Sequence, residues 1–283
     1  MSGSTPGRVA AEAREPMSLD DLDLPLGRAV GYPQQLDAQL LRGIPRTPLA
    51  GSAFQGADHW TAHEHSWLNS RGRPECGVLQ VRVPCLSPAF VESKSLKLYL
   101  MSFAMTQWPS AEDVRLQVLR DVAHVCGTDI EVQLRSIDAA LPTSPNELLG
   151  RCIDGATIDL PDFTARTVLP AVLAGAPLEE RLHSNLLRSL CPVTGQPDYA
   201  TLVIDYAGAP IDTTSMLGYL VGFRTTACFH EQLIEQVYVD VMTHCAPTDL
   251  RVMGLFCRRG GIDIVPVRSL APWDGTPPRG VRQ

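Results

Sequence analysis

A cysteine and an aspartate lie at the two ends of one short segment, Cys191–Asp198, which reads CPVTGQPD. Its two prolines and its glycine predict a rigid turn that holds these ends face to face. Cys191 can then act as a nucleophile while Asp198 takes the thiol proton and later returns it, since two such groups in contact share one proton. The alternative interpretation is a buried thiol followed by an ordinary turn-forming aspartate.

A second polar segment, Val91–Tyr99 (VESKSLKLY), lies where a predicted strand leads into a predicted helix. Free N–H groups at a helix start, the serine hydroxyls and Lys94 or Lys97 can bind an anion or the polar edge of a ring. The same residues also fit an ordinary helix start, with either serine as the N-cap and Glu92 merely favourable beside the helix dipole.

A third segment, Phe229–Glu231 (FHE), begins the longest predicted helix of the second half. A histidine at a helix start is more often structural than catalytic, and Glu231 in the first turn favours the helix dipole. Proton transfer by His230 is the functional alternative.

The fourth segment, Arg258–Gly261 (RRGG), follows a predicted strand. Two arginines and two glycines allow a guanidinium and the backbone to approach a phosphate closely. A basic turn between strands is the alternative. The chain contains neither a G-x-G-x-x-G sequence nor a P-loop, so a Rossmann mode of nucleotide binding is not expected.

Histidines gather in Asp58–His65, where His59, His63 and His65 accompany two carboxylates. Histidines with a carboxylate suit zinc or iron. No further ligand group stands at a supporting spacing, so we favour a solvated strand with His63 and His65 on one face. No metal is therefore expected.

Composition narrows the class of protein. The chain has 283 residues, 24 Lys and Arg against 31 Asp and Glu, and a formal charge of −7. An acidic chain is a poor partner for a phosphate backbone, so no direct nucleic-acid binding is expected. No apolar run approaches the ~20 residues of a membrane helix, and the first residues lack a signal-peptide core. The eight cysteines show no C-x-x-C pair. We expect a soluble cytoplasmic protein.

Periodicity predicts the same order of elements twice. Residues 120 positions apart correspond, such as Tyr99 with Tyr219 and Phe103 with Phe223. Each half is predicted as strand–strand–helix–helix–strand–strand, which favours an α+β fold with an antiparallel sheet and both helices on one face. The leucines from Leu182 to Leu190 fit a helix at least as well as a strand. The predicted strands are 76–83, 129–137, 200–206, 250–256 and 262–267, and the predicted helices are 95–107, one after Ser110, 212–225 and 229–245.

The four segments together resemble the QueF family, the NADPH-dependent 7-cyano-7-deazaguanine reductases. They follow in the family's order, and the resemblance extends from Leu26-Gly27 and Ile44-Pro45-Arg46 to the closing Val281-Arg282-Gln283. It matches the long, two-module branch of the family. The resemblance implies tandem tunnelling-fold (T-fold) modules, each an antiparallel four-stranded sheet with two helices on one face. We expect a tail and arm at 1–50, a first module at 51–160 and a second at 161–283.

The resemblance also implies the chemistry. Cys191 would add to the nitrile of 7-cyano-7-deazaguanine as a thioimide, Asp198 would donate the proton, and His230 would assist. Two NADPH per turnover would complete the four-electron reduction to 7-aminomethyl-7-deazaguanine, a step in queuosine biosynthesis for tRNA modification. A homo-oligomer, a dimer, is expected through the sheet edges. By resemblance, the substrate residues are Val91, Glu92, Ser93, His230 and Glu231, and the cofactor residues are Ser93, Lys94, Arg259 and Gly260.

Two alternatives stay open at this point. A cysteine-dependent nitrile hydrolase would form the same thioimide and then add water. A non-catalytic T-fold protein could bind purine-like rings in the same pocket without any reaction.

Overall fold

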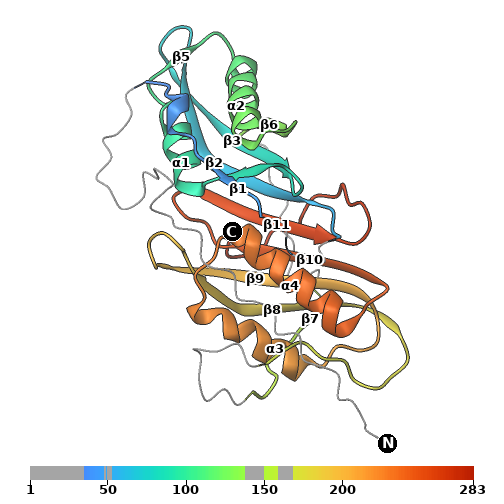
Figure 1. Cartoon of the computed structure of the whole chain (residues 1–283). Coiled ribbons are helices and arrows are strands. Elements are labelled where there is room, and N and C mark those ends of the chain that lie inside the picture. The colour runs from blue at the N-terminus through green and yellow to red at the C-terminus, as the bar shows by residue number, and fades with distance from the viewer. Residues whose placement is uncertain (1–34, 48, 50–52, 138–149, 159–167) are drawn as a thin grey trace, which may run out of the picture.

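The computed structural model describes residues 35–47, 49, 53–137, 150–158 and 168–283. Most of the expected N-terminal tail and arm, including Leu26-Gly27, therefore lies outside the described residues. A continuous nine-stranded sheet forms the centre of the molecule, in the order β6-β3-β2-β11-β10-β9-β8-β7, with β5 beside β2 (Figure 1). The α+β class expected from the sequence is confirmed.

The long strands of the sheet are β2 (Ala57–Asn69), β3 (Pro74–Pro84), β6 (Glu131–Ser136), β8 (Leu178–Leu190), β9 (Pro197–Gly208), β10 (Asp249–Phe256) and β11 (Ile262–Ser269). The short strands are β1 (Gly43–Pro45), β4 (Ala89–Val91), β5 (Gln107–Trp108) and β7 (Arg151–Cys152). The helices are α1 (Ser93–Met101), α2 (Ala111–Cys126), α3 (Thr213–Val221) and α4 (His230–Cys245), with 3₁₀ turns η2 (Ala38–Leu40) and η4 (Gly222–Thr225).

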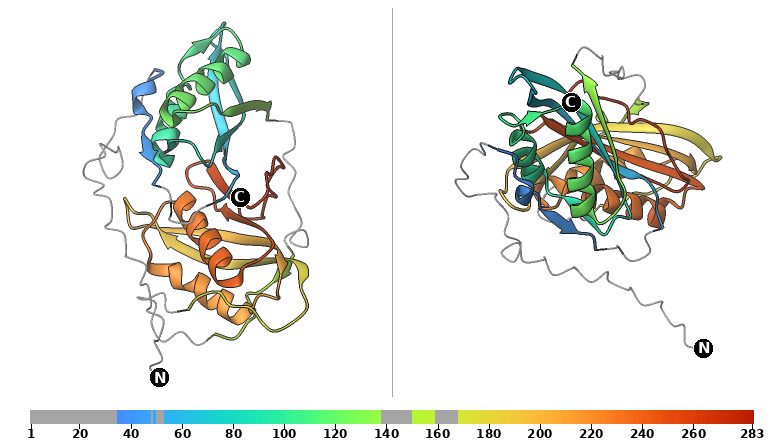
Figure 2. Two further views of the ribbon diagram at one scale, coloured as in Figure 1. Left: turned by 45° about the vertical axis from the view of Figure 1, so that its right-hand side comes forward. Right: turned by 90° about the horizontal axis from the view of Figure 1, so that it is seen from above.

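The two halves of the chain join where β11 pairs antiparallel with β2, with Ile264 opposite Trp60. Helices α1 and α2 cover the part of the sheet built from β2 and β3, and α3 and α4 cover the part built from β8 to β11 (Figures 1 and 2). Each pair buries an apolar face against its strands. In α2, for example, Val114, Val118 and Val122 repeat every four residues and are fully buried.

The first half departs from the expected four antiparallel strands. In the second half, β8, β9, β10 and β11 form four antiparallel strands, and each strand pairs with the next one along the chain. In the first half, the described residues give three antiparallel strands, β6, β3 and β2, and a short parallel strand β5. Strand β7 pairs with β8 instead. Residues 138–149, which follow β6, lie outside the described residues.

The leucine-rich segment from Leu182 to Leu190 is a strand, so its helical interpretation is wrong. A β-bulge lies between Ser184 and Leu187, which face Leu202 and Ala200 of β9. One extra residue shifts the alternation of β8, so Leu182 and Leu187 are buried while Leu186 is exposed. That shift gives the leucines a spacing close to a helical period. The predicted helices 95–107 and 212–225 are also too long, because α1 ends at Met101 and α3 at Val221.

The histidine segment is not a solvated strand face. A second bulge, between Ala62 and His65 of β2, inserts one residue, so His63 and His65 do not share a face. His65 is buried against Phe103 on the helix side, with ring centroids 5.0 Å apart. His63 Nε2 lies 2.6 Å from Asp263 Oδ2. Among the described residues, no group of three or more His, Cys, Asp and Glu side chains is placed to hold a metal ion.

No helix in the described part of the chain combines the length and the apolar character needed to cross a membrane.

Candidate active site

A cavity of about 550 Å³ opens between the two halves and contains residues of both. Its walls include every residue predicted to take part in the chemistry: Val91, Glu92, Ser93, Lys94, Cys191, Asp198, His230, Glu231, Arg259 and Gly260. Four segments that are distant in the sequence therefore meet in one place. Their individual roles stay predictions.

Glu92 is buried and forms the N-cap of α1. Its carboxylate accepts the backbone N–H groups of Lys94 at 2.9 Å and Ser95 at 2.7 Å. Burial raises the pKa of Glu92, and the two N–H donors offset this only in part. The expectation of a serine N-cap is therefore wrong, because the longer glutamate side chain reaches back to the same N–H groups. A carboxylate has about four acceptor positions, so Glu92 retains capacity for a ligand.

Cys191 lies at the start of a closed turn, as predicted. Its N–H donates to Gln196 O at 2.8 Å, and the N–H of Gly195 donates back to Cys191 O at 2.9 Å. Gly195 has φ +66°, a left-handed conformation that favours glycine. The N–H of Cys228 donates to Leu190 O at 3.1 Å, which ties this turn to the segment before α4. The thiol is partly exposed and lines the cavity.

Asp198 is buried at the start of β9 and holds two partners. Arg259 Nη1 donates to its Oδ1 at 2.7 Å, and His230 Nε2 lies 3.2 Å from its Oδ2. Burial by itself acts to raise the pKa of Asp198, but the contact with His230 and the charge of Arg259 outweigh it and hold the pKa below its usual range. The His230 ring stacks on Phe256, with centroids 3.9 Å apart. Asp198 is therefore an ionised carboxylate that can accept a proton.

Glu231 lies in the first turn of α4 and is buried. Its Oε1 has no hydrogen-bond partner among the described residues. Burial, followed by the negative charge of Asp58, raises the pKa of Glu231 to about 8. A buried polar atom without a partner costs on the order of 1–3 kcal/mol, which a ligand that fills the cavity can recover. Glu231 can therefore form a hydrogen bond with a ligand that enters the cavity.

The rim of the cavity carries the basic residues predicted for the cofactor. Gly260 has φ +60°, a left-handed conformation that favours glycine, and a Cβ added there would lie 2.5 Å from Lys97 Nζ, so a larger residue would require that lysine to move. Lys94 and Arg259 line the same rim. These cations and the close-lying backbone fit a phosphate-bearing cofactor. Arg259 also donates to Gln196 Oε1 at 2.6 Å, and its guanidinium has five N–H donors, so it can contact a cofactor as well.

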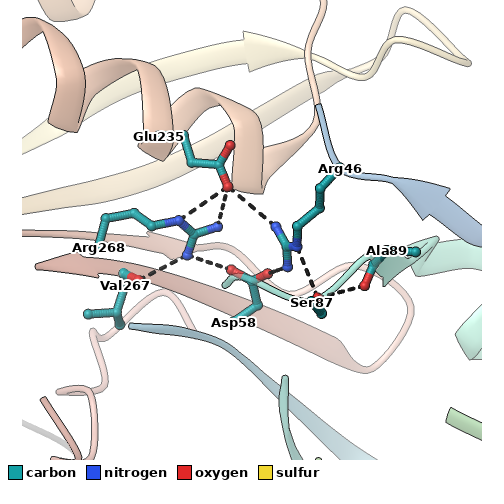
Figure 3. A network of polar contacts seen from close by, with 7 residues as sticks. All are labelled: Arg46, Asp58, Ser87, Ala89, Glu235, Val267 and Arg268. Atoms are coloured by element: carbon teal, nitrogen blue, oxygen red, sulfur yellow. Dashed lines mark hydrogen bonds and ion pairs between the residues drawn. The ribbon is translucent and has the colours of Figure 1, made fainter. Parts of the chain in front are cut away.

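A buried network of four charges was missed from the sequence (Figure 3). It joins Arg46, Asp58, Glu235 and Arg268, and we call it the four-charge network. Asp58 and Arg268 are completely buried, so the expectation that Asp58 faces solvent is wrong. One signal was present: Glu235 lies between two apolar pairs of α4, Leu233-Ile234 and Val237-Tyr238, and a charge buried among them needs a partner.

The apolar part of the cavity was also missed. Phe90 and Phe229 meet edge to face with ring centroids 5.4 Å apart, one from each half of the chain. Trp60 and Ile264, from the paired strands β2 and β11, line the same cavity. An apolar wall beside a few convergent polar groups is typical of a small-molecule site.

A partly exposed thiol, an Asp–His pair and two buried glutamates line one cavity, and these groups together are typical of an enzyme site that binds a small molecule. Residues 32–134 match the family described as nitrile reductase, 7-cyano-7-deazaguanine-reductase N-term, and residues 197–272 match the QueF-like protein family. The chain belongs to the QueF nitrile reductase family.

The matched relatives agree with this assignment. The chain is 43% identical over 258 residues to the NADPH-dependent 7-cyano-7-deazaguanine reductase of Burkholderia pseudomallei (strain 1106a), covering 87% of this chain and 92% of the relative. Identity is 42% over 253 residues to the enzyme of the same name from Burkholderia thailandensis, with the same coverage. A solved archaeosine synthase QueF-Like in the apo form matches with a TM-score of 0.31 and 16% identity, covering 35% of this chain and 99% of that chain.

Proposed function

We propose that this protein reduces the nitrile of 7-cyano-7-deazaguanine to the aminomethyl group of 7-aminomethyl-7-deazaguanine, with NADPH as reductant, in queuosine biosynthesis. One observation carries the proposal: Cys191 and Asp198 line the same cavity as Glu92 and Glu231. A nucleophile with a proton acceptor thus lies beside two carboxyls suited to the N–H edge of a guanine-like ring.

The first step is addition of the Cys191 thiol to the nitrile carbon. Asp198, whose pKa is held below its usual range, takes the thiol proton as the S–C bond forms and delivers it to the nitrile nitrogen. The product is a thioimide, and no net proton is gained or lost. His230, 3.2 Å from Asp198, keeps that carboxylate oriented and can pass the proton onward.

NADPH, when bound, supplies hydride. Ser93, Lys94, Arg259 and Gly260 would hold it, and Lys97 beside Gly260 adds a further positive charge. As the thioimide is reduced, Cys191 leaves as thiolate and an imine remains. Two hydrides and two protons convert one nitrile into one aminomethyl group, so two NADPH are consumed per turnover. The cavity walls must keep water from the imine during this sequence.

The purine-like ring would lie between the two halves. Glu92 and Glu231 accept its N–H groups, while Val91, Ser93 and His230 contact the ring beside them. The aromatic pair Phe90 and Phe229 supplies an apolar surface at the same cavity.

The wider organisation belongs to the same proposal. We propose tandem tunnelling-fold modules at 51–160 and 161–283, preceded by a tail and arm. We also propose a dimer formed through sheet edges, in the reducing cytoplasm where free thiols and NADPH coexist. None of the eight cysteines, all of which lie in the described residues, forms a disulfide, which is compatible with that compartment.

The test follows NADPH absorbance with 7-cyano-7-deazaguanine present. We expect two NADPH consumed per substrate, and a mass adduct on the protein when NADPH is omitted. Cys191→Ala should abolish both, whereas Cys257→Ser, which changes another thiol of the same cavity, should keep the adduct. Ammonia release without NADPH loss would indicate a hydrolase instead. Ring binding without an adduct or NADPH loss would indicate a non-catalytic binding protein.

A further inference from the structure

The two-stranded ribbon formed by β1 and β4 joins the two halves of the chain at the cavity. Ile44 of β1 lies directly opposite Phe90 of β4, and both side chains are buried. Phe229, the residue before α4, and Val193 of the turn at 191–198, which we call the Cys191 turn, pack against this pair. The four side chains form an apolar cluster of their own, separate from the helix–sheet cores of the two halves. The first half therefore supports the segment of the second half that carries the predicted nucleophile.

Arg46, which follows β1, holds this ribbon at Phe90. Its backbone N–H donates to Pro88 O at 2.9 Å, and its Nε donates to Ser87 Oγ at 3.0 Å. Ser87 Oγ in turn donates to Ala89 O at 2.7 Å, next to Phe90 in the chain (Figure 3). The guanidinium carbon of Arg46 lies 5.1 Å from the centre of the Phe90 ring, within the range of a cation–π contact. Arg46 thus contacts both the backbone beside Phe90 and the Phe90 ring itself.

Two carboxylates of the four-charge network fix the same guanidinium. Arg46 pairs with Asp58 and donates from Nη1 to Glu235 Oε1 at 3.3 Å. Glu235 lies in α4, the helix that Phe229 precedes, so Arg46 contacts both the ribbon and the helix whose aromatic rings meet at the cavity. The Arg46 side chain is 9% exposed, and its planar fork of N–H donors serves all these partners at once.

We propose that Arg46 is a positioning residue for the reaction: by holding Phe90 in place, it keeps the Cys191 turn where the thiol can attack the nitrile carbon. The inference rests on the proposed function, and it adds to that function a residue that does not itself line the cavity. A displacement of about 1 Å at a reacting atom can lower a rate about a hundredfold. Loss of this support should therefore affect the rate of thioimide formation more than the affinity for the ring.

The four-charge network contains a second arginine that allows a matched comparison. Arg268 donates to Asp58 Oδ1 and to Glu235 Oε1, at 2.8 Å each, and its guanidinium carbon lies 5.5 Å from the centre of the Phe54 ring. It therefore has the same two acidic partners as Arg46 and the same kind of ring contact. Phe54, however, belongs to the core of the second half and does not line the cavity. A change at Arg268 thus alters the network but not the contact with the ribbon.

The experiment measures the rate constant of adduct formation by rapid quenching and intact mass, with saturating 7-cyano-7-deazaguanine and no NADPH. Arg46→Lys keeps the positive charge but loses the planar group over Phe90 and the Nε donor to Ser87. Its rate constant should fall about tenfold to a hundredfold. The matched control, Arg268→Lys, should leave the rate constant nearly unchanged, although urea unfolding should show that both variants are less stable than the parent protein.

The amplitude of adduct formation separates positioning from folding. A partly unfolded variant forms less adduct in total, but its folded fraction reacts at the rate constant of the parent protein. Arg46→Lys should instead reach the full amplitude slowly, and the dissociation constant of the ring in a Cys191→Ala background should change less than the rate constant. If Arg46→Lys does not fold, Ile44→Val, which removes one methyl group from the same cluster, should lower the rate constant at full amplitude and supports the inference alone.

A rate constant equal to that of the parent protein in Arg46→Lys, or in Ile44→Val where it replaces that variant, would overturn the inference and leave the proposed function standing. An equal fall in Arg268→Lys would do the same, because the effect would then belong to the network and not to the contact with Phe90. A folded parent protein that forms no adduct with the nitrile would overturn the proposed function, and this inference with it.

Discussion

The two halves of the chain build the same hairpin and use it differently. In the first half, β2 ends at Asn69 and β3 carries Glu75, whose Oε1 accepts Asn69 Nδ2 at 2.9 Å on the surface. In the second half, Cys191 follows β8 and Asp198 lies in β9 at the matching position, since Pro74 and Pro197 both pair with the leucine near the end of the preceding strand. Cys191 and Asp198 of the second hairpin line the cavity, whereas Asn69 and Glu75 of the first do not.

At the starts of α1 and α3, it is the first half and not the second that contributes to the cavity. The carboxylate of Glu92 caps α1 by accepting two backbone N–H groups, and Asp212 caps α3 through the corresponding N–H groups of Thr214 and Ser215. Glu92 is buried at the cavity, whereas Asp212 is not part of it. The first half thus contributes its α1 cap to the cavity and the second half its hairpin turn. The hairpin turn of the first half and the α3 cap of the second do not line the cavity. Local sequence alone does not separate the two uses; contact with the other half does.

The largest expected effect is on the rate of NADPH oxidation, and it distinguishes the carboxylates at matching positions of the two hairpins. Asp198→Asn removes the proton acceptor beside Cys191 and should lower the rate of NADPH oxidation by about 10³-fold. Glu75→Gln, at the matching place on the surface, should stay within about twofold, since exposed pairs contribute little. Steady-state rates at saturating substrate measure both. Equal rates for both variants would make Asp198 a turn former only.

The next effect separates the two helix caps. Glu92→Ala and Asp212→Ala each remove a side-chain cap and should each cost about 1 kcal/mol of unfolding free energy. Only Glu92→Ala should also weaken binding of the cyano substrate, by about tenfold to a hundredfold, because a charge-assisted hydrogen bond is lost. Urea unfolding and substrate titration measure the two quantities. Normal substrate affinity in Glu92→Ala would remove Glu92 from the site.

A third prediction compares Glu231 and Glu112, each of which is the second residue of a long helix, α4 and α2 respectively. The pKa of Glu231 rises from about 4.5 to about 8 on folding, so the folded protein holds a proton that the unfolded chain releases. The stability of the parent protein should therefore fall as pH rises through this window. Relative to Glu231→Gln, the loss should approach about 1 kcal/mol per pH unit.

Urea unfolding of the parent protein and both variants at pH 5.5, 6.5 and 7.5 measures this. Glu112 is exposed and paired with Arg115, so Glu112→Gln should follow the parent protein across the range. Parallel curves for all three proteins would show that Glu231 has the same pKa in the folded and unfolded chains.

The smallest expected effect concerns a tyrosine–aspartate hydrogen bond that both halves of the chain contain. Tyr99 donates to Asp121 and Tyr219 donates to Asp240, each at 2.6 Å, and each tyrosine ring meets a phenylalanine at 5.2 Å. Tyr99→Phe and Tyr219→Phe should therefore lose similar stability, about 1 kcal/mol each, with unchanged substrate affinity. A difference of several kcal/mol between the two in urea unfolding would break the correspondence.

The sequence by itself determined the parts that depend on near neighbours. The CPVTGQPD turn, the FHE helix start and the pair of helices in each half were predictable, because prolines, glycines and periodic apolar residues act within a few positions. The cavity residues came from the resemblance, and the structure brings them together. The sequence near each hairpin and each cap did not predict which copy lines the cavity, because both copies form the same local structure.

Tertiary structure decided the rest. The bulges in β2 and β8 break the alternation that sequence patterns rely on, which made β8 resemble a helix and placed His63 and His65 on different faces. The four-charge network joins residues about 200 positions apart, such as Asp58 and Arg268. Whether such a charge is solvated or buried depends on partners that only the folded chain supplies.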